Sequence, residues 1–144
     1  MKYLLAFVAG FVSTFVFHQG LLWILHHAGA SPRPAYVMKP VPPLQVPLVV
    51  SLAFWGGVWA VALLPLLARW NGSWQYWVAW LVAGAVLPSI VALFVVMPWK
   101  GMPVAGGGDP KVLVGALLLN GAWGLGTALL LRLFQLLGTT TGTG

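Results

Sequence analysis

The sequence predicts an all-α integral membrane protein, built as a bundle of four transmembrane helices. Four long runs contain no Asp, Glu, Lys or Arg, and they are residues 3–25, 47–68, 75–97 and 112–131. Each run has about 20 residues or more, which is the length that an α-helix needs to cross a hydrocarbon core of roughly 30 Å. Of the 144 residues, 60% are hydrophobic and only 6% are charged, whereas soluble domains have about 25% charged residues.

The formal charge of +6 is spread along the chain rather than gathered in a patch. The seven basic residues stand singly, at Lys2, Arg33, Lys39, Arg69, Lys100, Lys111 and Arg132. Single cations of this kind flank membrane spans and meet anionic headgroups. Nucleic-acid binding requires a basic cluster, so we expect no nucleic-acid partner. The absence of cysteine excludes disulfides, thiol chemistry and Cys-ligated metals.

We expect the first helix to span about residues 2–27, because Gly29 and Pro32 then end it. Its apolar stretch is longer than the roughly 7–15 residues of a secretory signal, so we expect it to remain uncleaved. A Pro-rich loop, residues 31–46, comes next and favours polyproline II over helix. Because this loop also carries apolar side chains, we expect it to lie over the mouth of the bundle or on a partner.

The second helix is expected over about residues 47–69 and the third over about 74–97. Pro47 is a good first helical residue, and Ser73 is a good N-cap. The turn between the two helices is short, so we expect them to form an antiparallel hairpin. Trp70 and Trp74 lie at this end, as an interfacial aromatic belt would.

Pro98 ends the third helix, and the Gly-rich loop that follows is expected to be mobile. Asp109 is the only acidic residue, and together with Pro110 it forms an N-cap followed by a first helical residue. The fourth helix is then expected over about residues 110–137, ended by Gly138. This gives one transmembrane domain, residues 1–138, and a flexible tail, residues 139–144.

The sequence also indicates an internal duplication. Residues 3–10 (YLLAFVAG) match residues 76–84 (YWVAWLVAG) with one insertion, and residues 57–62 (GVWAVA) share a pattern of small residues around Trp with residues 121–126 (GAWGLG). We therefore predict two copies of a helical hairpin, related by a pseudo-two-fold axis along the membrane normal.

Small and weakly polar residues interrupt the apolar runs at helical spacing. Helices in lipid need small residues for close packing, so such faces predict contact surfaces within the bundle. The alternative is a narrow polar path through the membrane. The residues open to both interpretations are Thr14, His18, Asn120 and Thr127.

His18 lies inside the first apolar run, and ionisable residues there are functional candidates because of their cost in lipid. It is either a neutral imidazole bonded to Asn120, Gln19 or a backbone carbonyl, or it handles protons or ions. A haem with two His ligands would require a dimer, because all three histidines lie on the first helix. We expect no cofactor.

A soft-metal site is a further hypothesis. His26 and His27 end the first helix, and Met97 and Met102 flank the Pro98 turn at the same membrane face. Imidazole and thioether together suit Cu(I). The alternative is that these four side chains are ordinary packing residues at the interface.

The sequence lacks a nucleophile–base–acid set, a phosphate-binding loop and metal-ligand spacing, so we do not expect an enzyme. It also lacks an acidic residue within the spans, which disfavours carboxylate-driven transport. Residues 41–57 (VPPLQVPLVVSLAFWGG), 120–132 (NGAWGLGTALLLR) and 18–20 (HQG) resemble a family of small uncharacterised bacterial four-span inner-membrane proteins. The resemblance implies a bacterial inner membrane and four spans, and it implies no catalytic or binding residues.

The expected function is therefore that of a non-enzymatic accessory, assembly or scaffold subunit of a membrane complex. Its expected partners are the lipid bilayer and other membrane subunits or a second copy. The alternative is a small oligomeric transporter or channel with His18 and Asn120 on the path. The amino terminus and the short turn at Arg69 favour an N-in, C-in orientation.

Overall fold

The computed structural model describes residues 1–141, and the side chains of residues 1–138. The chain is mostly helical, and its helices group into four stretches that are long and apolar enough to cross a membrane. These stretches are Lys2–His27, Leu48–Trp70, Trp74–Trp99 and Pro110–Gly138. The prediction of an all-α protein with four apolar helices is therefore confirmed.

The first and third stretches each contain a π-helical turn. In the first, α1 (Lys2–Ser13) leads through the π-turn Thr14–His18 into α2 (Gln19–His27). In the third, α4 (Trp74–Val91) leads through the π-turn Ala92–Val96 into the short α5 (Met97–Trp99). A π-turn shifts the helical hydrogen-bonding ladder by one residue and so redirects the side chains that follow.

The second stretch is α3 (Leu48–Leu67) followed by the 3₁₀ turn Ala68–Trp70. Its N-cap is Pro47, one residue before the helix, rather than the first helical residue that we expected. The fourth stretch is α6 (Pro110–Thr141), which continues past the predicted end at Gly138. The expected tail, residues 139–144, is thus helical up to Thr141, and its last three residues lie outside the described chain. A glycine lowers helix stability by about 1 kcal/mol without forbidding the helix, and no proline follows Gly138.

The Pro-rich loop packs on its own chain. Strands β1 (Pro40–Val41) and β2 (Val46–Pro47) pair antiparallel within it. The backbone N–H groups of Leu48 and Val49, in the first turn of α3, donate to the carbonyls of Lys39 and Val37 at 3.0 and 3.1 Å. The loop thereby supplies hydrogen-bond acceptors to helical N–H groups that have no intrahelical partner.

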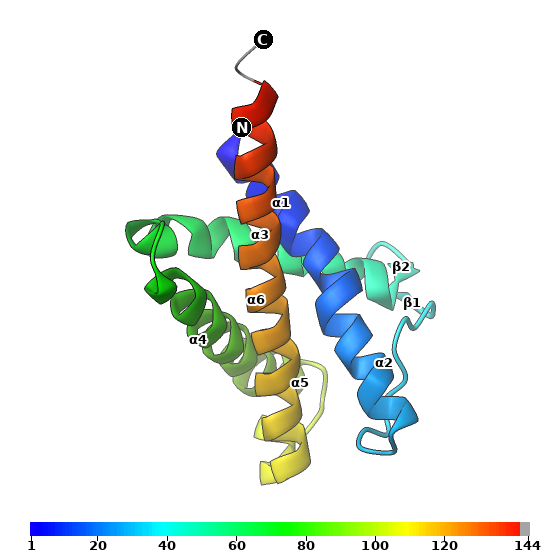
Figure 1. Ribbon diagram of the computed structural model, residues 1–144. Helices are drawn as coiled ribbons and strands as arrows, with labels where there is room; N and C mark the ends of the chain where they lie inside the picture. The colour runs from blue at the N-terminus through cyan, green and yellow to red at the C-terminus, as the bar shows by residue number, and fades with distance from the viewer. Residues whose placement is uncertain (142–144) are drawn as a thin grey trace.

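Figure 1 shows how the helices are arranged. α1 and α4 run in the same direction, towards the lower right, while α3 and α6 run back and cross each other steeply. The pairs that pack along their lengths are α1 with α3 and α4 with α6, and α1 also packs on α6. The N-terminus and the end of α6 lie together at the top of this view, whereas α2 ends and α6 begins at the bottom.

The second and third helices, which we expected to form an antiparallel hairpin, are joined by a short turn but do not pack along their lengths. α3 and α4 meet near their connecting turn and then diverge. The reason lies in their small residues: Gly56 and Ala60 of α3 face α1, and Gly84 of α4 faces α6. Close helix contact in lipid requires small residues on the facing surfaces, so these positions, rather than the length of the turn, decide which helices pair.

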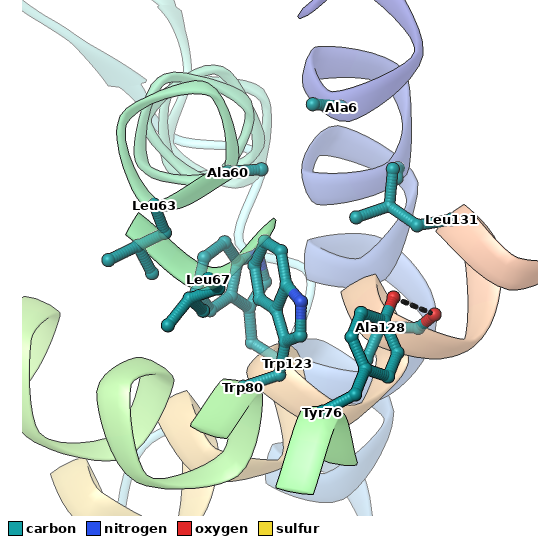
Figure 2. Close-up of a cluster of buried hydrophobic side chains, with 10 residues drawn as sticks. Ala6, Ala60, Leu63, Leu67, Tyr76, Trp80, Trp123, Ala128 and Leu131 are labelled. Carbon is teal, nitrogen blue, oxygen red and sulfur yellow. Dashed lines mark hydrogen bonds between the residues drawn. The ribbon is translucent and has the colours of Figure 1, made fainter. Parts of the chain in front are cut away.

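A cluster of buried apolar side chains fills the space where the four stretches meet (Figure 2). Trp80 of α4 and Trp123 of α6 are its largest members, with 1% and 3% of their surfaces exposed. The Tyr76 hydroxyl donates to the Ala128 carbonyl at 2.8 Å, the bond drawn as a dashed line in Figure 2. α4 and α6 are therefore joined by both apolar packing and a buried hydrogen bond.

The connection between α5 and α6 is a compact turn. Ala105, Gly106 and Gly107 have positive φ values of 52°, 63° and 71°. A Cβ at Gly106 would lie 2.6 Å from Cγ1 of Val112, so the turn needs a glycine here to pack on α6. Asp109 caps α6 as predicted, because its Oδ1 accepts a 2.9 Å hydrogen bond from the Lys111 N–H.

Candidate functional site

Each pair of packed helices approaches at a glycine. In the first pair, a Cβ at Gly10 of α1 would lie 2.6 Å from the Cβ of Ala60 and would also collide with the Gly56 carbonyl on α3. In the second pair, a Cβ at Gly84 of α4 would lie 2.8 Å from Cα of Gly124 on α6. Only glycine permits backbones to come this close, so small residues lie at the contact in both pairs.

The two approaches use equivalent positions of the internal repeat. Gly10 and Gly84 end the matching motifs of the first and third helices. Ala60 of the second helix aligns with Gly124 of the fourth, because each lies three residues after the glycine that begins its motif, Gly57 or Gly121. The same turn of each motif therefore makes the contact in both hairpins.

A reciprocal set of hydrogen bonds joins α1 to α6. Trp123 donates from Nε1 to the Gly10 carbonyl at 3.0 Å, and Ser13 donates from Oγ to the Trp123 carbonyl at 2.7 Å. The same two carbonyls also accept from Thr14 and Thr127 within their own helices, at 3.0 and 2.9 Å. We call these five residues the α1–α6 polar contact.

α3 packs against the α1–α6 polar contact. A Cβ at Gly56 would lie 3.0 Å from Trp123 Nε1 and would collide with the Thr14 hydroxyl. Thr14 and Thr127 are buried, at 3% and 0% exposure. The structure thus places two of the four polar candidates in a buried contact between helices, where each hydroxyl has a backbone partner.

His18 belongs to a different cluster. Its Nδ1 lies 3.1 Å from Nε2 of Gln19, one of the partners expected from the sequence. Gln19 is 2% exposed, and its Oε1 accepts from the Tyr36 N–H at 2.8 Å. The Tyr36 hydroxyl donates to the Phe15 carbonyl, inside the π-turn, at 2.7 Å. Gln19 and Tyr36 therefore fasten the Pro-rich loop to the first helix beside His18.

Asn120 lies on α6 and bonds to the neighbouring α4. Its Nδ2 donates to the Ser89 hydroxyl at 2.9 Å, and Ser89 is buried. His18 and Asn120 therefore have separate partners, on separate pairs of segments. The four polar candidates are divided among three local contacts.

The four soft-metal candidates lie on α2, on α5 and in the loop after α5. His26 and His27 end α2, and their Nδ1 atoms lie 2.9 Å from the Ser31 carbonyl and 2.8 Å from the Trp23 carbonyl. Met97 begins α5, and Met102 follows it. Among the described residues, no group of three or more His, Cys, Asp or Glu side chains could hold a metal ion.

Four residues in these contacts were not predicted from the sequence. Ser13, Ser89 and Trp123 bridge helices, and Tyr36 bridges the loop to the first helix. Ser13 and Ser89 could have been found from the sequence, because each is a hydroxyl side chain within an apolar run. Trp123 stood in the repeat motif, but its partner is 110 positions or more away in the chain.

No protein-family model, curated protein or solved structure matches this chain. The class that the fold defines is an all-α protein with four apolar helices of membrane-spanning length.

Proposed function

We propose that the chain is a multi-pass membrane protein whose four apolar stretches cross the bilayer. Large apolar side chains cover its outer surface, including Leu81, Val82, Ile90, Phe94 and Val95 on the third stretch. In water such a surface would cost free energy in proportion to its area, whereas lipid covers it without that cost. The Trp residues at the α3–α4 turn fit the depth of an interfacial belt.

Within the membrane, we propose that the protein acts as a non-enzymatic accessory, assembly or scaffold subunit. The observation that supports this proposal is that the polar side chains inside the helices form hydrogen bonds to other parts of the same protein. Ser13, Thr14, Asn120, Trp123 and Thr127 all bond within or between helices. Among the described residues, no buried side-chain N or O atom lacks a hydrogen-bond partner. The polar chemistry therefore holds helices together, and the outer apolar faces are available to lipids and membrane partners.

Two measurements test this proposal. Alkaline carbonate should leave the protein in the membrane pellet, as it does for integral proteins, while it releases peripheral ones. Chemical crosslinking in native membranes, followed by purification in mild detergent, should recover a complex with another membrane chain or a second copy. Recovery of the protein only as a free monomer would contradict the subunit proposal.

We also propose that the chain is a duplicated hairpin with both copies in the same orientation. The shared direction of α1 and α4 in Figure 1 supports this, as does the equivalent use of Gly10 and Gly84. The resemblance to small bacterial inner-membrane proteins favours that membrane as the location. An N-in, C-in orientation remains part of the proposal.

The alternative function, a small oligomeric transporter or channel, needs His18 and Asn120 on one path. Their separate partners, Gln19 and Ser89, do not favour it. The double variant His18→Ala, Asn120→Ala tests it in proteoliposomes. Ion or substrate flux that is unchanged in this variant excludes the proposed path.

A further inference from the structure

A groove of about 570 Å³ opens between the start of α4 and the last turns of α6. Gly72 and the indole of Trp74 lie on its α4 side, together with Ser73 and Trp77. From α6 it is lined by Arg132, Gln135 and Leu136. The groove therefore combines one cation, two indoles and an apolar side chain at the ends of two apolar helices.

Arg132 is held in a fixed place beside the groove. Its guanidinium carbon lies 4.3 Å from the centre of the Tyr76 ring, which is a cation–π contact. Tyr76 is itself fixed, because its hydroxyl donates to the Ala128 carbonyl at 2.8 Å. Arg132 Nη1 also reaches Oε1 of Gln135 at 3.5 Å, a long and weak hydrogen bond. In these two contacts between described residues, the groups that position the guanidinium, Tyr76 and Gln135, are both neutral.

No acidic side chain of this chain can neutralise Arg132. The single acidic residue, Asp109, caps the start of α6. Arg132 stands 23 residues further along the same helix, and at 1.5 Å per residue this separates the two by about 35 Å. A cation at the edge of an apolar surface without an acidic side chain beside it can pair with an anion from outside the chain.

The surroundings of Arg132 indicate the depth and the chemistry of that counter-ion. Trp74 and Trp77 are 71% and 37% exposed, and indoles concentrate at the level of lipid headgroups. Arginine pairs well with phosphate because its planar fork of N–H groups matches two phosphate oxygens. Trp77 and Leu136 offer apolar surface next to this point, where an acyl chain can lie.

We propose that this groove is a binding site for an anionic phospholipid, with its phosphate on Arg132 and an acyl chain along Trp77 and Leu136. The inference rests on the proposed membrane location. Basic pockets between transmembrane helices are a known way of holding anionic headgroups. Here the pocket is pre-arranged by the contact between Arg132 and Tyr76.

The test measures lipid binding to the full-length protein in neutral detergent by native mass spectrometry. The probes are dioleoylphosphatidylglycerol, the neutral dioleoylphosphatidylcholine, and glycerol 3-phosphate as a soluble phosphate ester. We expect phosphatidylglycerol to bind in preference to phosphatidylcholine, and Arg132→Gln to weaken it about five- to tenfold. We expect glycerol 3-phosphate not to displace it, because the soluble ester has no acyl chain for the groove.

Arg69→Gln is the matched control. Arg69 lies at the same end of the molecule and also stacks on an indole, at 4.9 Å from Trp70, but it does not line the groove. This variant should change phosphatidylglycerol binding less than twofold, because Arg69 makes no contact within the groove. Equal losses in Arg69→Gln and Arg132→Gln would overturn the proposal, because they would show general surface attraction.

Gln135→Glu provides a second variant that does not remove Arg132. It places a carboxylate beside the guanidinium, and this internal partner should compete with the lipid phosphate and weaken binding as Arg132→Gln does. Unchanged binding in Gln135→Glu would overturn the site, and so would displacement of the lipid by glycerol 3-phosphate. Loss of the protein from carbonate-washed membranes would refute the membrane location, whereas a membrane-embedded protein without lipid preference would refute this site alone.

Discussion

Gly124 marks the point where the backbones of α4 and α6 come closest. A Cβ there would lie 3.2 Å from Cα of Gly84 and would collide with the Trp80 carbonyl. Backbone atoms cannot move aside as a flexible side chain can, so the contact is sensitive to one added methyl group. Next to it, the α1–α6 polar contact fixes a second close approach through Trp123 and Ser13.

Gly124→Ala should destabilise the protein by about 1–3 kcal/mol, because the new methyl group overpacks the contact with α4. Gly115→Ala is the matched control, since it lies on the same helix with no atom within 4 Å of its added Cβ. Circular dichroism during unfolding by SDS in mixed micelles measures both. A loss in Gly115→Ala as large as that in Gly124→Ala would show that the backbone approach is not the cause.

Ser13→Ala should lower the free energy of unfolding by roughly 0.6–1.7 kcal/mol, the range for hydrogen bonds between helices in membranes. The variant removes the bond from α1 to the Trp123 carbonyl. Thr127→Val serves as the comparison, because the Thr127 hydroxyl bonds within its own helix and valine keeps its shape. We expect Thr127→Val to cost less than Ser13→Ala in the same SDS titration, and the reverse order would contradict the role assigned to Ser13.

At the level of helices, pairing follows small residues rather than chain order. α1 packs on α3 and α4 on α6, while α3 and α4 separate after their turn. The α1–α6 polar contact and the central apolar cluster then join the two pairs. Each half of the chain is therefore a packed pair of helices. The two halves are joined through defined hydrogen bonds and buried apolar side chains.

This organisation predicts that the chain can be divided at the α3–α4 turn. Fragments 1–71 and 72–144, produced together, should associate and co-purify in mild detergent, because the contacts between α1 and α6 do not need the turn. Ser13→Ala combined with Trp123→Leu should reduce this co-purification several-fold. Leu118→Ala, on the exposed surface of α6, should leave it unchanged. Failure of the unmodified fragments to associate would contradict the division into two packed pairs.

The helices could be predicted from sequence because the absence of charge over about 20 residues is a local property. The cap at Asp109 was predictable for the same reason. Which helices pack together was harder to predict from sequence. Gly56 of α3 could face either α1 or α4, and the short turn between α3 and α4 does not determine which. The hydrogen bond between Ser13 and Trp123 could not be predicted either, because the two residues are 110 positions apart in the chain.

At the scale of the whole molecule, the helices connect two ends. The N-terminus and the last turns of α6 share one end in Figure 1, and the end of α2 and the start of α6 share the other. By their places along the chain, three basic residues belong to the first end and four to the second. The numbers of basic residues therefore do not determine the orientation. The orientation of the chain in a bilayer can instead be determined by labelling two positions, one near each end.

The chain contains no cysteine, so single cysteines report sidedness without a background. Lys2 and Lys111 are both exposed, and they lie at the start of α1 and the start of α6. With an N-in, C-in orientation, a membrane-impermeant maleimide should label Lys2→Cys only in inside-out vesicles and Lys111→Cys only in right-side-out vesicles. Both should react after solubilisation in detergent, which controls for access. Labelling of both from one side would contradict the four-span topology, whereas exchange of the two sides would keep the four spans and reverse the orientation.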